Sequence, residues 1–179
     1  MANVKASDIK SLGIYEREAG IDNGAPIGEH QVVAEQSEVR VDKLGNPVLF
    51  TLQRVKGGDF NKRTIPQTYR WFVAEVDGDG NAKPKEKIAS GNGFARKQTL
   101  DVLKAAFGKN IAEWPKEIEV LPGKDSTPED VKEFFSMVAP VLKGRGFTVT
   151  VSAGMKDGVE TGFQNFVYSA AKEVTAFKL

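Results

Sequence analysis

Apolar and polar residues alternate in five separate runs of this chain, and each run predicts a β-strand. In the first run, Val33, Val39 and Val41 share one face, while Glu38 and Arg40 share the other. Glycine, asparagine and proline residues stand between the runs, where they favour reversals of the chain. We expect strands over residues 29–41, 47–56, 69–76, 146–153 and 161–170.

Two helices are predicted between the third and fourth strands. Leucine and phenylalanine recur at helical spacing over residues 94–107, and Gly108 follows as a stop. The second helix begins with Thr127 as its cap and Pro128 in its first turn. Its apolar residues share one face, as in a helix that packs on a sheet: Val131, Phe134, Phe135, Val138 and Leu142. Residues 7–19 allow a further short helix.

Three strands, a helical region and two more strands follow one another in the order of the oligonucleotide/oligosaccharide-binding (OB) barrel. We therefore predict a mainly β fold, a five-stranded antiparallel OB-type barrel with helices between strands three and four. Residues 28–171 would form this domain, with residues 88–143 as a helical insertion. Residues 1–27 are interpreted as an N-terminal arm and residues 172–179 as a C-terminal tail.

The composition limits the kinds of partner and chemistry. In 179 residues, 25 Lys and Arg balance 24 Asp and Glu, so a nucleic-acid site requires local clustering of positive charge. The chain has no cysteine, which excludes disulfides, thiol nucleophiles and cysteine-ligated metals. Its first residues lack the apolar region of a secretory signal, and no apolar run approaches the roughly 20 residues of a membrane helix. We expect a cytoplasmic protein that does not contact a membrane.

Motifs for catalysis or ion binding are weak. His30 is the only histidine and no nucleophile motif accompanies it, so we expect it to be structural or exposed. Residues 77–81 resemble the start of a calcium loop. The twelfth position from Asp77 is Ile88, however, where a calcium loop requires a bidentate glutamate. We expect no enzymatic activity, no metal and no cofactor.

A glycine-containing segment at residues 89–96 precedes the first predicted helix, as in a phosphate-binding loop. It lacks the Gly-Lys-Ser/Thr run and the third glycine of the nucleotide fingerprints. Flexible glycines and Asn92 as a helix cap explain it without a ligand, although Arg96 and Lys97 could hold a backbone phosphate. The three lysines before it are interpreted as a basic linker: Lys83, Lys85 and Lys87.

Basic and aromatic side chains interleave on the second and third strands and their loop, as in proteins that hold single strands. Bases stack on aromatic rings for about 1–3 kcal/mol each, and Lys and Arg replace counterions along the phosphates. Aromatic residues on strands are often core, and we expect at least half of the four on these two strands to be buried. The candidate nucleic-acid-binding residues are Arg54, Lys56, Phe60, Lys62, Arg63, Tyr69, Arg70 and Trp71.

Several stretches together resemble the OB-fold single-stranded-DNA-binding proteins of bacteriophages, over about residues 28–171. They are PIGEHQVV at 26–33, KLGNPVLFTL at 43–52, VKGGDFNKR at 55–63, LKGRGFTVTV at 142–151 and GFQNFVY at 162–168. The resemblance implies protection of single-stranded DNA during phage replication or recombination, without strong sequence preference or a cofactor, in the host cytoplasm. Residues 172–179 differ from the acidic tail by which many such proteins recruit partners.

We expect the DNA strand to cross the second and third strands of the sheet. Its phosphates would lie at Arg54, Lys62, Arg63 and Arg70, and its bases would stack on Phe60, Tyr69 and Trp71. An alternative is a non-enzymatic structural or protein-interaction module of a virus that uses the same barrel. A nuclease or hydrolase is a third hypothesis, disfavoured because the acidic residues lie on different elements. Replication or recombination proteins are possible partners, and the chain is compatible with a homodimer.

Overall fold

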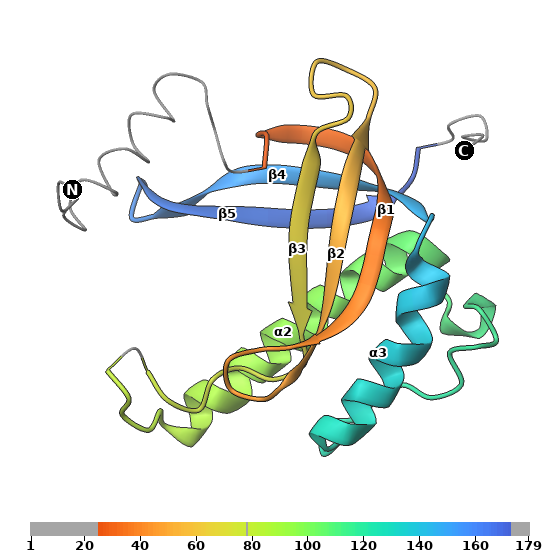
Figure 1. Ribbon diagram of the computed structural model, residues 1–179. Helices are drawn as coiled ribbons and strands as arrows, with labels where there is room; N and C mark the ends of the chain where they lie inside the picture. The colour runs from red at the N-terminus through yellow and green to blue at the C-terminus, as the bar shows by residue number, and fades with distance from the viewer. Residues whose placement is uncertain (1–24, 78, 173–179) are drawn as a thin grey trace, which may run out of the picture.

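The computed structural model describes residues 25–77 and 79–172, so most of the N-terminal arm and its predicted helix lie outside the described residues. The strands of the described part are β1 (Gly28–Val41), β2 (Pro47–Lys56), β3 (Thr64–Arg70), β4 (Gly146–Lys156) and β5 (Val159–Ala170) (Figure 1). Between β3 and β4 lie α2 (Lys85–Phe107), the 3-10 turn η1 (Ile111–Glu113) and α3 (Pro128–Leu142). None of the helices described is long and apolar enough to cross a membrane.

The five strands form one antiparallel sheet in the order β3-β2-β1-β4-β5. β1 joins its two halves, because Val32 lies opposite Val55 of β2 and also opposite Phe147 of β4. Figure 1 shows the β4–β5 hairpin crossing the direction of the other three strands. The mainly β, five-stranded antiparallel prediction is therefore confirmed. The predicted barrel is not closed, since β3 and β5 are the two ends of the sheet and share no ladder.

Side chains span the gap between these two ends. The rings of Tyr69 on β3 and Tyr168 on β5 meet edge to face at 5.8 Å between centroids. The Tyr69 hydroxyl accepts a hydrogen bond of 2.6 Å from Gln53 Nε2. Burial raises the pKa of Tyr168 to about 12, so its phenol remains neutral. The two free edges are thus linked through the buried Tyr69 and the partly buried Tyr168, and not through backbone hydrogen bonds.

A bulge in β1 separates the predicted apolar face of that strand into two. The register with β2 shifts between Ala34 and Gln36. Val33 consequently lies opposite Arg54, whereas Val39 lies opposite Leu49, and these two β2 positions point to opposite faces of the sheet. The expectation that Val33 and Val39 share a face was wrong, because one extra residue in a strand inverts the alternation.

The position of the third strand was predicted least accurately. β3 covers Thr64–Arg70 and not residues 69–76, whereas β2 has the predicted bounds and β1, β4 and β5 differ from theirs only at their ends. Pro66 lies within β3 opposite Leu52. A proline within a strand disfavours a central position, but β3 is an edge strand, where a missing N–H is tolerated. Trp71 therefore follows the strand instead of belonging to it.

α2 begins nine residues before the predicted start, at Lys85 instead of residue 94. Gly91 lies inside the helix, where a Cβ atom would come within 2.9 Å of Cγ2 of Val73, so the glycine permits close packing. Asn92 is not a helix cap, because its Oδ1 accepts a 2.7 Å hydrogen bond from the backbone N–H of Val73. The linker interpretation was wrong for Lys85, and also for Lys87, which both lie in the helix.

α3 begins as predicted, with a capping box at its N-terminus. Thr127 Oγ1 accepts from the backbone N–H of Asp130, and the Asp130 carboxylate accepts from the backbone N–H of Thr127 at 2.7 Å. These hydrogen bonds lower the pKa of Asp130. The apolar face of α3 is buried in the same core as the inward residues of the sheet and of α2. Both helices therefore pack on the core side of the sheet (Figure 1).

Candidate nucleic-acid interface

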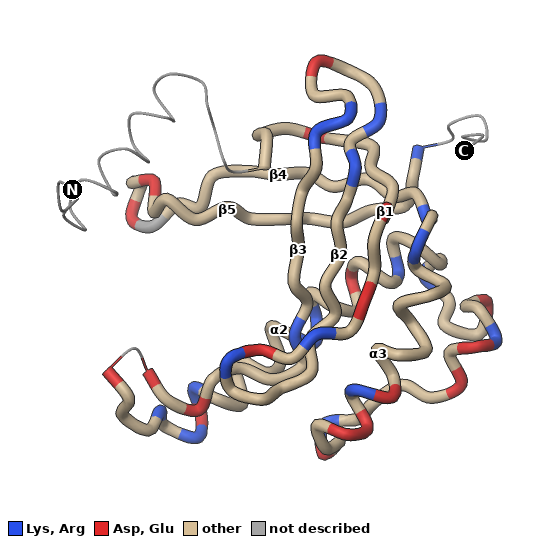
Figure 2. The backbone as a smooth tube through the Cα atoms, in the orientation of Figure 1, with Lys and Arg blue, Asp and Glu red and all other residues tan. Residues whose placement is uncertain are grey.

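The loop between β2 and β3 is a compact turn. It carries two of the predicted basic residues, Lys62 and Arg63, and a third, Lys56, directly precedes it. Gly57 and Gly58 adopt positive φ angles of 79° and 66°, which reverse the chain without a side-chain clash. The Asn61 side chain accepts from the backbone N–H of Gly57 at 3.0 Å. Backbone hydrogen bonds join Val55 to both Lys62 and Arg63. Figure 2 shows Lys and Arg on both arms of this loop.

Phe60 lies at the tip of the loop and is 38% exposed. Its ring meets the imidazole of His30 edge to face, with 5.6 Å between centroids. The guanidinium carbon of Arg63 lies 6.0 Å from the centre of the Phe60 ring. His30 is itself buried, and its Nε2 lies 2.8 Å from the Pro26 carbonyl oxygen. Of the two expectations for His30, structural or exposed, the structure shows a buried side chain, and its ring contacts Phe60, the only predicted stacking residue that stays exposed.

Arg54 is held by two neighbours on the same side of the sheet. Its Nε donates to Glu35 Oε2 at 2.9 Å, and its Nη1 donates to the backbone carbonyl of Lys62 at 2.8 Å. These contacts lower the pKa of Glu35, chiefly through the hydrogen bond with Arg54 and also through the positive charge of Lys56. Arg54 therefore ties the β1 bulge to the loop, and much of its charge is already neutralised.

Lys56 and Lys62 differ from Arg54 in this respect. Neither forms an ion pair with a described residue. Lys56 ends β2 and Lys62 lies near the end of the loop, one residue before Arg63, so both lie at the same end of the sheet as Phe60. Within the part of the chain that the structure describes, these two ammonium groups form no ion pair, although the positive charge of Lys56 also acts on Glu35.

Arg70 lies at the other end of β3. Six residues separate it from Thr64, which corresponds to about 20 Å of extended strand. Its Nε lies 3.8 Å from a carboxylate oxygen of Asp42, in the turn after β1. The structure therefore does not gather Arg70 with the loop residues, although it places Arg70 on the same face of the sheet as Thr68 and Pro66.

Tyr69 and Trp71 are buried, which corrects the prediction that they stack on bases. They are 4% and 2% exposed. Tyr69 faces the core because it shares the parity of buried Ile65 on β3. The Trp71 ring packs edge to face on Phe134 of α3, and its indole N–H donates to the Gly123 carbonyl at 3.4 Å. The Trp71 ring packs the sheet against α3 and the Tyr69 ring packs against Tyr168 of β5, so both are closed to a ligand.

Two aromatic residues that the sequence analysis left out lie on accessible surface. Phe50 is half-buried and shares the parity of Arg54 and Lys56 on β2, with the Arg40 guanidinium 3.5 Å above its ring centre. Phe163 on β5 is 78% exposed. The alternation of β2 could have revealed Phe50, because residues two and four positions apart share a face. Nothing in the local pattern distinguishes Phe163 from the half-buried Phe166.

The described residues contain no group of three or more histidine, aspartate or glutamate side chains that could hold a metal ion. Asp77, the first residue of the calcium-like segment, uses Oδ1 to accept the backbone N–H groups of Asp79 and Asn81. These hydrogen bonds, with that of Asn81 the largest influence, lower the pKa of Asp77. Val76 and Ala82 pair across the turn, as in a hairpin.

Comparison of the chain with models of protein families gives no match, and comparison with curated proteins gives no match either.

Proposed function

We propose that this protein binds single-stranded DNA without strong sequence preference, through an OB-type sheet, and protects it during phage replication or recombination in the host cytoplasm. The strand order, with β1 shared between two halves and helices inserted between β3 and β4, is consistent with an OB-type sheet. No enzymatic step is part of the proposal.

The β2–β3 loop carries the proposal. It carries the half-exposed Phe60 ring, with the Arg63 guanidinium 6.0 Å from the ring centre, and has Lys62 near its end and Lys56 at its start. A ring with cations around it matches a nucleotide strand, because bases stack on the ring while phosphates approach the cations. Unpaired bases offer their faces to such a ring, whereas bases of a duplex are already stacked. The site therefore favours single strands over duplex DNA.

The ion pairs on the sheet set the expected strength of binding. Arg54 and Arg70 face Glu35 and Asp42, so the positive potential is concentrated at the loop and does not extend evenly along β2 and β3. The strand would enter at the loop and continue toward Phe50. We expect moderate affinity with a salt dependence set by a few phosphate contacts.

The test compares exposed phenylalanines at matched positions. F60A removes a ring from the proposed path, while F94A removes a ring that is 64% exposed on α2, on the helical side of the sheet. Stacking on one ring contributes about 1–3 kcal/mol, so F60A should weaken binding of oligothymidylate by roughly fivefold or more. F94A should leave the affinity unchanged. Equal losses for F60A and F94A, or no loss for F60A, would contradict the proposed path.

A second candidate function is that of a protein-interaction module, and the surface of the β4–β5 hairpin favours it. The β4–β5 hairpin exposes four apolar side chains by more than half: Met155, Val159, Phe163 and Val167. β5 is also an edge strand without a charged residue between Thr161 and Ala170, and charged edge residues are a common protection against pairing. A second copy of the chain could add to this edge. Dimerisation that F163A and V167A abolish, without DNA binding at low salt, would select this function.

A further inference from the structure

A cavity of about 340 Å³ opens between the β1 bulge and the turn that joins α3 to β4. Val33, Arg54 and Lys56 line it, so it lies on the same face of the sheet as the proposed DNA path. The turn is fixed against the bulge, because the N–H of Gly144 donates to the Ala34 carbonyl at 2.8 Å. The volume of the cavity is at the lower end of the range for small-ligand pockets, about 300–1,000 Å³.

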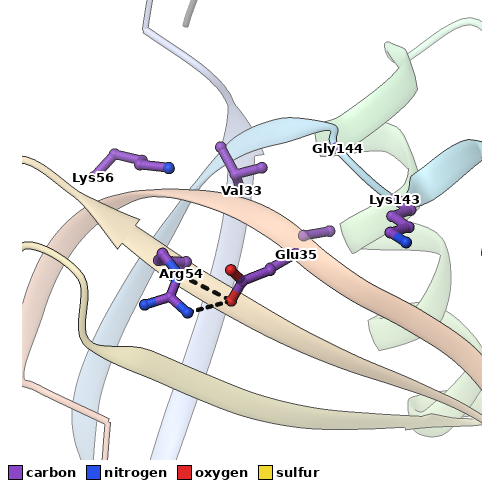
Figure 3. A pocket seen from close by; sticks show the side chains of 7 residues that line it. Val33, Glu35, Arg54, Lys56, Lys143 and Gly144 are labelled. Atoms are coloured by element: carbon purple, nitrogen blue, oxygen red, sulfur yellow. Dashed lines mark hydrogen bonds and ion pairs between the residues drawn. The ribbon is translucent and has the colours of Figure 1, made fainter. Parts of the chain in front are cut away.

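The lining combines an apolar floor with a carboxylate and two lysines. Val33 and Ala34 form the apolar floor, of which Val33, 8% exposed, contributes the accessible part, while Ala34 is 0% exposed. Figure 3 shows Lys56 on one side of the cavity and Lys143 on the other, with the Glu35 to Arg54 pair between them. The cavity is therefore cationic at its sides and carries a hydrogen-bond acceptor in its centre.

Glu35 presents one carboxylate oxygen that the described residues do not use. Oε2 accepts hydrogen bonds from both Nε and Nη2 of Arg54, whereas no described residue donates a hydrogen bond to Oε1. The pKa of Glu35 is lowered by Arg54, so the group is ionised at neutral pH and can only accept. An occupant that satisfies this oxygen must carry an N–H or O–H donor.

We infer that the cavity takes one base of the bound strand, and that Glu35 gives the protein a modest preference for bases with an exocyclic amino group. This inference rests on the proposed function. The amino group of cytosine donates to a carboxylate, which is an established pairing of protein side chains with bases. Lys56 and Lys143 lie on either side, where the phosphates of adjoining nucleotides would pass.

Thymine fits the same cavity less well. Its single N–H lies between two carbonyl oxygens, which a carboxylate repels, and it carries no amino group. An acidic peptide is disfavoured for the same reason, since its carboxylates would meet Glu35. The geometry therefore favours cytosine over thymine, two pyrimidines of nearly equal size.

The experiment measures dissociation constants for labelled oligocytidylate and oligothymidylate of equal length, at slightly alkaline pH, by fluorescence anisotropy. E35Q removes the carboxylate from the cavity. E38Q is the matched control, because Glu38 is on the same strand and is also paired to an arginine, Arg40, but does not line the cavity. K143Q gives a second readout, with K132Q on α3 as its control. Thermal unfolding verifies that each variant is folded.

The wild-type protein should bind oligocytidylate about fivefold more tightly than oligothymidylate, within the range for one base contact. E35Q should reduce this ratio to about one, and E38Q should preserve it. K143Q should weaken both oligonucleotides by a similar factor without changing the ratio, and K132Q should change neither. If the wild-type protein binds both oligonucleotides tightly and equally, the base pocket is refuted while the proposed function stands. If neither oligonucleotide binds at low salt, both fail.

Discussion

Replacing Lys56 and Lys62 with glutamine should weaken single-stranded DNA binding by removing two phosphate contacts. Both ammonium groups are without an ion pair among the described residues, so the substitutions break no salt bridge there. We expect the free energy of unfolding to stay within about 0.5 kcal/mol of the wild-type value, as for other surface changes. Any large loss of affinity can then be assigned to the interface.

The size of the loss follows from counterion release. Each phosphate neutralised on a single strand adds about 0.7 to the negative slope of log K against log salt. Loss of two contacts should lower the slope by about 1.4, which corresponds to roughly 60-fold in affinity near 50 mM salt. The slope is the more specific readout, because stacking on Phe60 contributes to affinity but not to the release of ions.

The assay is fluorescence anisotropy of a labelled oligothymidylate over a series of salt concentrations. The double variant K116Q/K132Q is the control, since it removes the same charge from exposed lysines outside the proposed interface. Screening over about 10 Å at 0.1 M salt makes such distant charges unimportant. An unchanged slope for K56Q/K62Q, or an equal loss of slope in the control, would refute the assignment of these lysines to phosphates.

Three further predictions concern stability. G93A should stabilise the protein by up to about 1 kcal/mol in urea unfolding, whereas G91A should not, because its Cβ would press on Val73. Folding lowers the pKa of Asp130, so its carboxylate stabilises the folded protein fully above the ordinary pKa of 3.8. This stabilisation is lost as the pH falls through the lower pKa of the folded protein. D130N should therefore flatten the dependence of the free energy of unfolding on acid pH. The pKa of Tyr168 is raised to about 12, so stability should fall as the pH rises from 10 toward 12, and Y168F should remove that component in alkaline unfolding measurements.

Much of the fold was predictable because several elements have strong local signals. The bounds of β2 follow from alternation that starts at Pro47, and α3 follows from the Thr127 cap with Pro128 behind it. β3 covers Thr64–Arg70 instead of residues 69–76 and includes Pro66, which an edge strand tolerates. Gly91 misplaced the start of α2, since its role depends on a distant contact that no local pattern contains.

The candidate site was predicted less well, for reasons that involve distant partners. Arg54 was expected to be available for phosphates, but it pairs with Glu35, 19 residues away in the sequence, across the β1 bulge. Tyr69 and Trp71 were expected to stack, but the true bounds of β3 place Tyr69 on the core face and leave Trp71 against α3. Lys56 is the last residue of β2, as the predicted bounds of that strand had it.

The burial of both tryptophans determines how the central claim is measured. Trp71 and Trp114 lie in the core, so a bound strand should change their fluorescence little. The reporter must therefore be the labelled DNA.

The most direct test is a titration of labelled oligothymidylate with this protein at about 50 mM and about 200 mM salt, beside a duplex of equal length. The account predicts saturable binding of the single strand that weakens roughly tenfold between the two salt concentrations, with much weaker binding of the duplex. Absence of binding at the lower salt concentration, or affinity that does not change with salt, would contradict it.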